Sequence, residues 1–147
     1  MARIAALLFA PLFAVALVAG MALPAAAAPA SDADRTAIQA MIGQQIEAFR
    51  HDDGGAAYGL ASPAIRSIFP TADAFMAMVT QGYPMVYRPQ SVTFGPLLDT
   101  PLGPVQKVFI TGPDGQSYVA LYPMQRQPDG TWKINGCSIE KDESPTI

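Results

Sequence analysis

The run His51-Asp52-Asp53 is the only group of neighbouring side chains in the sequence that could serve an acid–base step or bind a metal. Imidazole and carboxylate groups are the usual general bases, and both also ligate metals. Adjacent side chains rarely point at one site, however, and a cationic His51 where a helix ends would be stabilised by the helix dipole. These three residues are therefore weak catalytic candidates, and the sequence predicts no metal site and no cofactor.

Cys137 is the only cysteine of the chain, so no internal disulfide can form. A reactive thiol needs a cation or a helix N-terminus beside it, whereas Cys137 falls at an apolar position of an expected strand. A free cysteine in such a place behaves as a small hydrophobic residue. The position favours a buried structural thiol over a nucleophile.

Gln45 lies in the middle of the apolar stripe of an expected helix, between Ile42 and Phe49. A buried amide is costly unless it finds hydrogen-bond partners, so Gln45 either bonds to the sheet or lines a pocket. Aromatic and cationic side chains could add polar groups at the mouth of such a pocket, although they could equally pin a loop. We therefore name six ligand-binding candidates: Gln45, Tyr58, Tyr83, Tyr87, Arg88 and Cys137.

The elements that would position these side chains separate into a helical half and a strand half, which is typical of the α+β class. Apolar residues at helical spacing, capping residues and Pro84 predict helices at 32–50, 56–60, from 62 onward, and from 71 to 83 at most. Alternating β-branched and aromatic residues, divided by Pro-Asp-Gly turns, predict an antiparallel meander of four strands at 91–97, 105–111, 116–125 and 131–140.

Two strands have unusual patterns. In the last strand Trp132 and Ile134 share one parity while Cys137 and Ile139 share the other, so one extra residue at Asn135-Gly136 would restore a single apolar face. This predicts a β-bulge. The third strand is apolar on both faces, which predicts that helices cover one face and something else covers the other, most simply a second copy in a homodimer through the sheet.

The N-terminus has the order of a secretory signal peptide: Arg3, a charge-free apolar run, and small residues at 25–30. Cleavage is expected after Ala27 or Ala30, which gives a signal peptide over 1–30, one domain over 31–141 and a polar tail over 142–147. The alternative is an uncleaved membrane anchor, against which Gly20 and Pro24 argue. The protein is therefore expected to be periplasmic or secreted, with no membrane contact once the signal is removed.

Charge limits the partners. The chain has 9 basic and 12 acidic side chains and a net charge of −3, and it offers no basic stripe that could release counterions from a nucleic acid. Nucleic acid is therefore not expected as a partner.

Several segments carry a resemblance to a known family. These are Gln45-Ile46-Glu47-Ala48-Phe49, Asp52-Asp53, Phe75-Met76-Ala77-Met78-Val79, Tyr87-Arg88-Pro89 and the run from Asp129 through Trp132 to Cys137. Over about residues 34–140 the chain resembles the exported proteobacterial domain of unknown function 4864 family, of the nuclear-transport-factor-two-like (SnoaL-like, cystatin-like) superfamily. The resemblance implies helices packed on a bent four-stranded sheet that forms a cone.

Cones of this kind host isomerases, cyclases and dehydratases as well as plain binding modules, so the fold alone does not give the function. The resemblance implies that an enzyme of the superfamily would need a carboxylate or histidine inside the cone, and no pair of acids converges in this sequence. The preferred hypothesis is a non-catalytic module for a small, partly apolar ligand or for protein interaction. The alternatives are an isomerase-, cyclase- or hydrolase-type enzyme and a structural envelope protein without a pocket.

Overall fold

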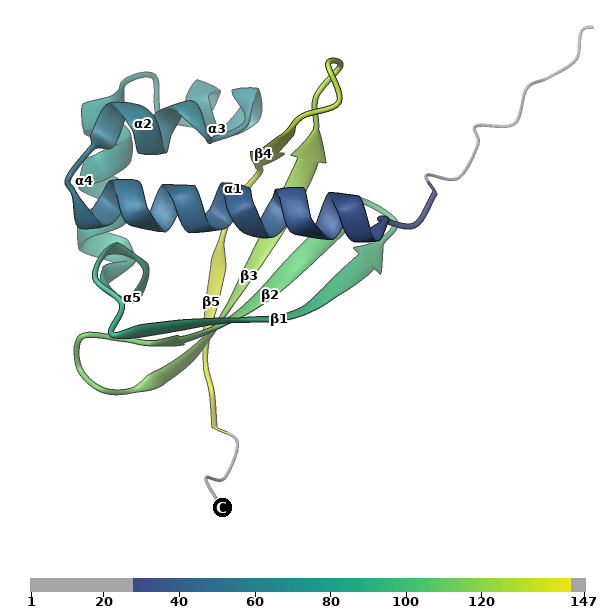
Figure 1. The fold of residues 1–147 in the computed structure, drawn as a ribbon. Helices are drawn as coiled ribbons and strands as arrows, with labels where there is room; N and C mark the ends of the chain where they lie inside the picture. Colours follow the sequence, from purple (N-terminus) through teal and green to yellow (C-terminus); the bar gives the residue numbers. More distant parts are fainter. Residues whose placement is uncertain (1–27, 144–147) are drawn as a thin grey trace, which may run out of the picture.

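The computed structural model describes residues 28–143, so the expected signal peptide and most of the C-terminal tail lie outside the described residues. The described chain begins with five helices and ends with an antiparallel sheet (Figure 1), which confirms the α+β class. The helices are α1 Asp32–Arg50, α2 Gly54–Gly59, α3 Pro63–Ile68, α4 Ala72–Gly82 and α5 Pro84–Tyr87. Within the described residues, no helix has the length and apolar character to cross a membrane.

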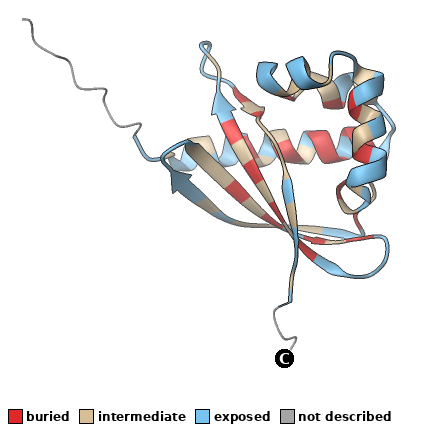
Figure 2. Ribbon diagram, turned by 180° about the vertical axis from the view of Figure 1, so that it is seen from behind, coloured by how far each residue is buried: buried red, intermediate tan, exposed pale blue. Residues whose placement is uncertain are grey.

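Helix α1 begins where the sequence provides a complete capping box. The Ser31 hydroxyl accepts a hydrogen bond from the Asp34 amide, and the Asp34 carboxylate accepts one from the Ser31 amide, so two otherwise unpaired helix donors are satisfied. One stripe of the helix, including Ile38, Ile42 and Phe49, is buried, and α1 contacts α2, α5 and β4. The buried positions, red in Figure 2, gather where α1 crosses the strands.

Helix α5 was not expected from the sequence. Pro84 does end α4, whose last residue is Gly82, but it then occupies the first position of a new turn. Proline suits this position because its missing N–H would be unpaired there anyway.

The sheet contains β1 Ser91–Thr100, β2 Gly103–Thr111, β3 Ser117–Arg126, β4 Trp132–Ile134 and β5 Ser138–Lys141. Strands β1, β2 and β3 follow one another antiparallel, and both β4 and β5 pair with β3. The expected fourth strand is thus divided in two, and the sheet has five strands rather than four.

The division falls at the predicted β-bulge. Ile134 lies opposite Met124, whereas Ser138 lies opposite Leu121, so four steps on one strand match three on the other. Gly136 has a φ of 152°, a value that side chains rarely allow. The extra residue places Trp132, Ile134 and Ile139 on one face, as the sequence pattern required.

A second bulge lies in β1, where Phe94 pairs with Val108 but Leu97 pairs with Gln106, so that Gly95 and Pro96 oppose one residue. The fully buried side chain of Gln106 holds this bulge in place. Its amide nitrogen donates to the carbonyl oxygens of Gly95 and Lys107, each at 2.8 Å. The Gln106 side chain therefore donates hydrogen bonds to backbone carbonyl oxygens where the β1–β2 pairing is interrupted.

Replacing Gln106 by leucine is expected to lower the free energy of unfolding by about 1–3 kcal/mol, because two partly buried carbonyls lose their donor. Chemical denaturation measures this. Gln44→Leu, at an exposed position of α1, is the matched control and is expected to stay within about 0.5 kcal/mol of the parent protein. Equal effects of the two substitutions would contradict a structural role for Gln106.

Candidate functional site

A cavity of about 240 Å³ lies between the helices and the inner face of the sheet. Most of its lining is apolar, and five aromatic rings contribute: Phe49, Phe69, Phe75, Tyr83 and Tyr122. The rest comes from α1, α3, α4, α5, the segment between α2 and α3, β4 and the bulge after it. Both the helical half and the sheet therefore contribute to the lining.

Gln45 lines this cavity from α1 and is 4 % exposed. Its side-chain nitrogen donates to the carbonyl oxygen of Ala57 at 3.1 Å, which fixes the orientation of the amide because a carbonyl can only accept. The side-chain oxygen accepts no hydrogen bond from the described residues. Gln45 therefore lines a pocket, as the second sequence alternative stated, whereas the expected bond to the sheet is wrong because its partner lies on α2.

Tyr83 and Cys137 also line the cavity, and the Tyr83 hydroxyl donates to the Cys137 carbonyl oxygen at 3.1 Å. Cys137 as a residue keeps some exposed surface, but its thiol is largely buried. Burial raises the pKa of the thiol to about 12 and also raises the pKa of Tyr83. Both groups are therefore uncharged at neutral pH.

Tyr122 is the polar residue that the sequence reasoning missed. It lines the cavity from β3 at 1 % exposure, and its hydroxyl has no hydrogen-bond partner in the described part of the chain. Burial, followed by the nearby Cys137 thiol, raises its pKa well above the ordinary value, but the thiol contact lacks the geometry of a directed hydrogen bond. The one sequence signal for Tyr122 as a site residue is its position in a strand that is apolar on both faces.

The aromatic wall of the cavity is centred on Phe75 of α4. Its ring centroid lies 5.6 Å from that of Tyr58, and 6.3 Å from those of Phe49 and Phe69. Tyr58 does not line the cavity; its hydroxyl donates to the carbonyl oxygen of Phe69 at 2.6 Å. Its contact with the site is therefore indirect, through the residues that it holds in place.

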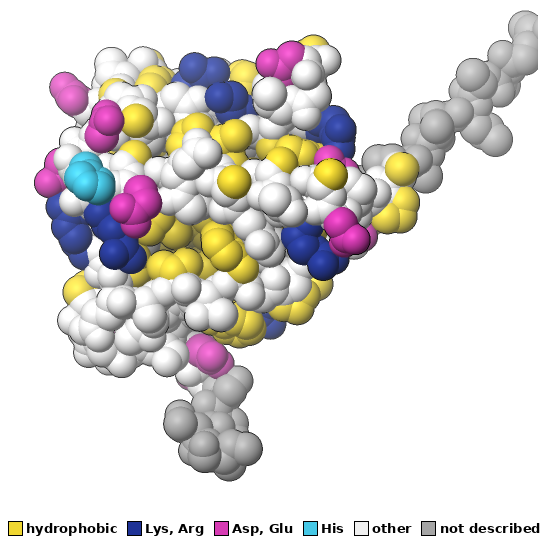
Figure 3. Space-filling model, in the orientation of Figure 1, with side chains coloured by type: hydrophobic (Ala, Val, Ile, Leu, Met, Phe, Trp, Pro, Cys, Tyr) yellow, Lys and Arg dark blue, Asp and Glu magenta, His cyan; other side chains and the backbone are white. Residues whose placement is uncertain are grey.

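The three weak catalytic candidates do not converge. The ring nitrogen Nδ1 of His51 lies 2.8 Å from the Glu47 carbonyl oxygen at the end of α1, and the Asp53 side chain caps α2 through the Ala56 amide. Asp52 faces Arg88 instead. Figure 3 shows the only histidine, in cyan, at the surface among charged side chains.

Tyr87 and Arg88 also lie outside the cavity lining. Arg88 forms a two-pronged ion pair with Asp52, with both N–O distances at 3.0 Å, and stacks on the Tyr87 ring. The Tyr87 hydroxyl donates to the same carboxylate, and this bond, followed by Arg88, lowers the pKa of Asp52. Asp52 has a φ of 52°, so this network holds a backbone turn.

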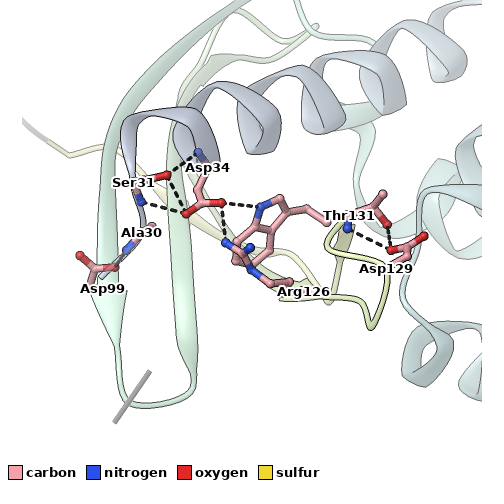
Figure 4. Close-up of polar contacts among 8 residues, drawn as sticks. Ala30, Ser31, Asp34, Asp99, Arg126, Asp129 and Thr131 are labelled. Carbon is pink, nitrogen blue, oxygen red and sulfur yellow. Dashed lines mark hydrogen bonds and ion pairs between the residues drawn. The ribbon is translucent and has the colours of Figure 1, made fainter. Parts of the chain in front are cut away.

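A second polar network joins the start of α1 to the sheet (Figure 4). Asp34 accepts hydrogen bonds from Ser31, from the indole nitrogen of Trp132 and from Arg126, whose guanidinium stacks on the Trp132 ring at 4.6 Å. The bonds from Ser31 are the main reason why the pKa of Asp34 is lowered. This stabilisation is present above the ordinary pKa of 3.8 and is lost as the pH falls through the lowered value.

The acidic and basic side chains of the described residues are thus engaged in caps, turns and ion pairs where the structure shows their contacts, and none of them lines the cavity. No three His, Cys, Asp or Glu side chains between residues 28 and 143 could hold a metal together. The fold and site define a small α+β domain with a neutral, mainly apolar cavity between helices and an antiparallel sheet.

The chain belongs to the family described as Domain of unknown function (DUF4864), which it matches over residues 31–147. No curated protein and no solved structure matches the chain.

Proposed function

We propose that this domain is a non-catalytic binding module that holds a small, partly apolar ligand in the cavity between the helices and the sheet. The observation that carries the proposal is the cavity itself, which combines a lining of aromatic and aliphatic side chains with a few polar groups. Small-molecule sites have this composition, because apolar contacts give affinity and isolated polar groups give orientation.

The positions of the ionisable groups support binding over catalysis. A general base must lie within hydrogen-bond reach of its substrate, and the His51, Asp52 and Asp53 side chains are bonded elsewhere. The thiol of Cys137 is kept protonated by burial. The lining therefore has groups that can hold a ligand and lacks a group poised to move a proton at neutral pH.

The proposal includes export to the periplasm, supported by the charge-free run that precedes the alanine-rich segment. N-terminal sequencing of protein from fractionated cells is expected to begin at Ala28 or Ser31. A chain that still begins at Met1 would contradict export with cleavage. We also propose membership of the proteobacterial nuclear-transport-factor-two-like proteins, supported by helices packed on one face of a twisted antiparallel sheet (Figure 1).

Filling the cavity tests the binding function. Met78 is a partly buried lining residue of α4, and Met78→Trp is expected to reduce the ligand-bound fraction at least tenfold, as counted by native mass spectrometry of protein purified from its own periplasm. Met41→Trp is the matched control, because Met41 is also partly buried but does not line the cavity. Wild-type protein without a bound small molecule, or Met78→Trp protein that retains it, contradicts the proposal.

We further propose that the sheet pairs with a second copy. The face away from the helices, which Figure 2 views, carries Phe109, Val119 and Leu121 side by side on β2 and β3, and Phe109 is 37 % exposed. Lys107 and Glu140 lie on the same face, so a two-fold axis could bring each beside its opposite charge on the partner. The occupant that matches this surface is therefore the same surface of another chain.

Phe109→Asp is expected to convert a dimer to a monomer, because it buries an unpaired charge in the interface. Sedimentation at micromolar concentrations measures the change. Leu102→Asp is the control, since Leu102 is 98 % exposed at the β1–β2 turn. A wild-type protein that is monomeric at every concentration would overturn the pairing.

A further inference from the structure

The chemistry of the cavity wall limits the charge of its ligand. Four polar side chains line it, namely Gln45, Tyr83, Tyr122 and Cys137, and each is uncharged at neutral pH. A charged group moved into apolar surroundings loses its hydration and needs an opposite charge to compensate. No lining residue provides one, so the cavity favours an uncharged ligand.

Two of these four side chains have a polar atom without a hydrogen-bond partner among the described residues. The amide nitrogen of Gln45 is engaged with Ala57, which leaves the side-chain oxygen as an acceptor without a donor. The Tyr122 hydroxyl is buried and forms no hydrogen bond with any described residue. Native structures satisfy nearly all buried polar atoms. The buried Tyr122 hydroxyl without a partner, with the Gln45 side chain beside it in the cavity lining, therefore points to a ligand group that pairs with them.

The unsatisfied groups differ in what they need. The Gln45 oxygen can only accept, whereas the Tyr122 hydroxyl can donate or accept. The Tyr83 hydroxyl already donates to the Cys137 carbonyl, so it too offers a ligand only its acceptor side. A hydroxyl group on the ligand can donate a hydrogen bond to the Gln45 oxygen or to the Tyr83 hydroxyl. With the Tyr122 hydroxyl it can either donate or accept.

We propose that the ligand is an uncharged alcohol or phenol, whose apolar body fills the aromatic cavity and whose hydroxyl pairs with Gln45 or Tyr122. This inference rests on the proposed binding function and specifies its ligand class. With about 240 Å³ available, the cavity is smaller than the ~300–1,000 Å³ of typical drug-sized sites. Small probes of one ring are therefore appropriate.

The experiment compares three probes of matched shape by isothermal titration at pH 7: p-cresol, toluene and 4-methylbenzoate. The protein is the processed wild type, unfolded and refolded to remove its own ligand, with its native mass checked to show that none is left. We expect p-cresol to bind about fivefold more tightly than toluene, the effect of one net hydrogen bond. The anionic 4-methylbenzoate is expected to bind at least a hundredfold more weakly than p-cresol.

Variants assign the hydrogen bond. Gln45→Met and Tyr122→Phe each remove one candidate partner of the ligand hydroxyl while keeping most of the side-chain volume, and at least one is expected to weaken p-cresol about fivefold without weakening toluene. Tyr118→Phe is the matched control on β3, because its hydroxyl is bonded to Asp114 and it does not line the cavity. Tyr122→Phe is expected to fold normally, since the hydroxyl that it loses has no partner.

The outcomes separate the two proposals. If toluene binds as tightly as p-cresol, if 4-methylbenzoate binds best, or if neither variant changes the preference, the alcohol or phenol assignment is wrong and the cavity remains a binding site. If none of the three probes binds to ligand-free wild type, the proposed binding function fails together with the ligand class.

Discussion

Phe75→Ala is expected to lower the free energy of unfolding by about 3–5 kcal/mol, the usual cost of deleting a buried aromatic ring. Phe75 is 5 % exposed and its ring contacts those of Phe49, Tyr58 and Phe69. These contacts join α4 to α1 and to the segment around α2 and α3, so one substitution loosens the whole aromatic wall. Since small domains are stable by only about 5–15 kcal/mol, the loss is a large share of the total.

Urea denaturation followed by circular dichroism measures this change. Ile68→Ala is the control, because Ile68 is 67 % exposed on α3 and its truncation is expected to cost no more than about 0.5 kcal/mol. A cost for Phe75→Ala as small as that of the control would mean that α4 is held to α1 and to the segment around α2 and α3 by other contacts.

Cys137 is expected to react with a thiol reagent at least a thousandfold more slowly in the native protein than in denaturant. Burial raises its pKa to about 12, so at pH 8 only about one thiol in 10⁴ is ionised, against about a quarter at the ordinary pKa of about 8.5. The enclosing side chains slow the reagent further. Reaction with a disulfide reagent, with and without denaturant, gives both rates.

A ligand in the cavity should slow native labelling again, because Cys137 is part of the lining. Labelling that is equally fast in the native and denatured states would mean that the thiol is accessible and ionisable, and it would reopen the nucleophile hypothesis for this residue.

Most of the fold could be predicted from local sequence. Capping residues, helical spacing and Pro-Asp-Gly turns are short-range signals, and the expected α1, the antiparallel meander and the bulge near Gly136 agree with the structure. Helix α5 was missed because a proline such as Pro84 can mark both the end of one helix and the first position of the next. The β1 bulge was missed because the residue that fastens it, Gln106, lies on the next strand.

Three of the six binding candidates, Gln45, Tyr83 and Cys137, line the cavity. Gln45 interrupts an apolar stripe and does line the cavity. Tyr122 lies in a strand that is apolar on both faces, where a tyrosine fits at any position. The local sequence therefore does not show that its hydroxyl lacks a partner. Tyr87 and Arg88 were chosen for their chemistry, but their partner Asp52 lies some 35 residues away in the sequence, where no periodicity can reveal it.

The bulge at Gly95-Pro96 also bears on how the molecule behaves in a crowded compartment. Among residues 28–143, strand β1 pairs only with β2, so its other edge presents backbone groups to which a strand of another chain could add. Pro96 offers no N–H there, and the bulge bends the strand away from the straight path that a growing ladder requires. The β1 bulge, which the buried Gln106 side chain holds in place, is therefore expected to protect the exposed edge against fibril-like aggregation.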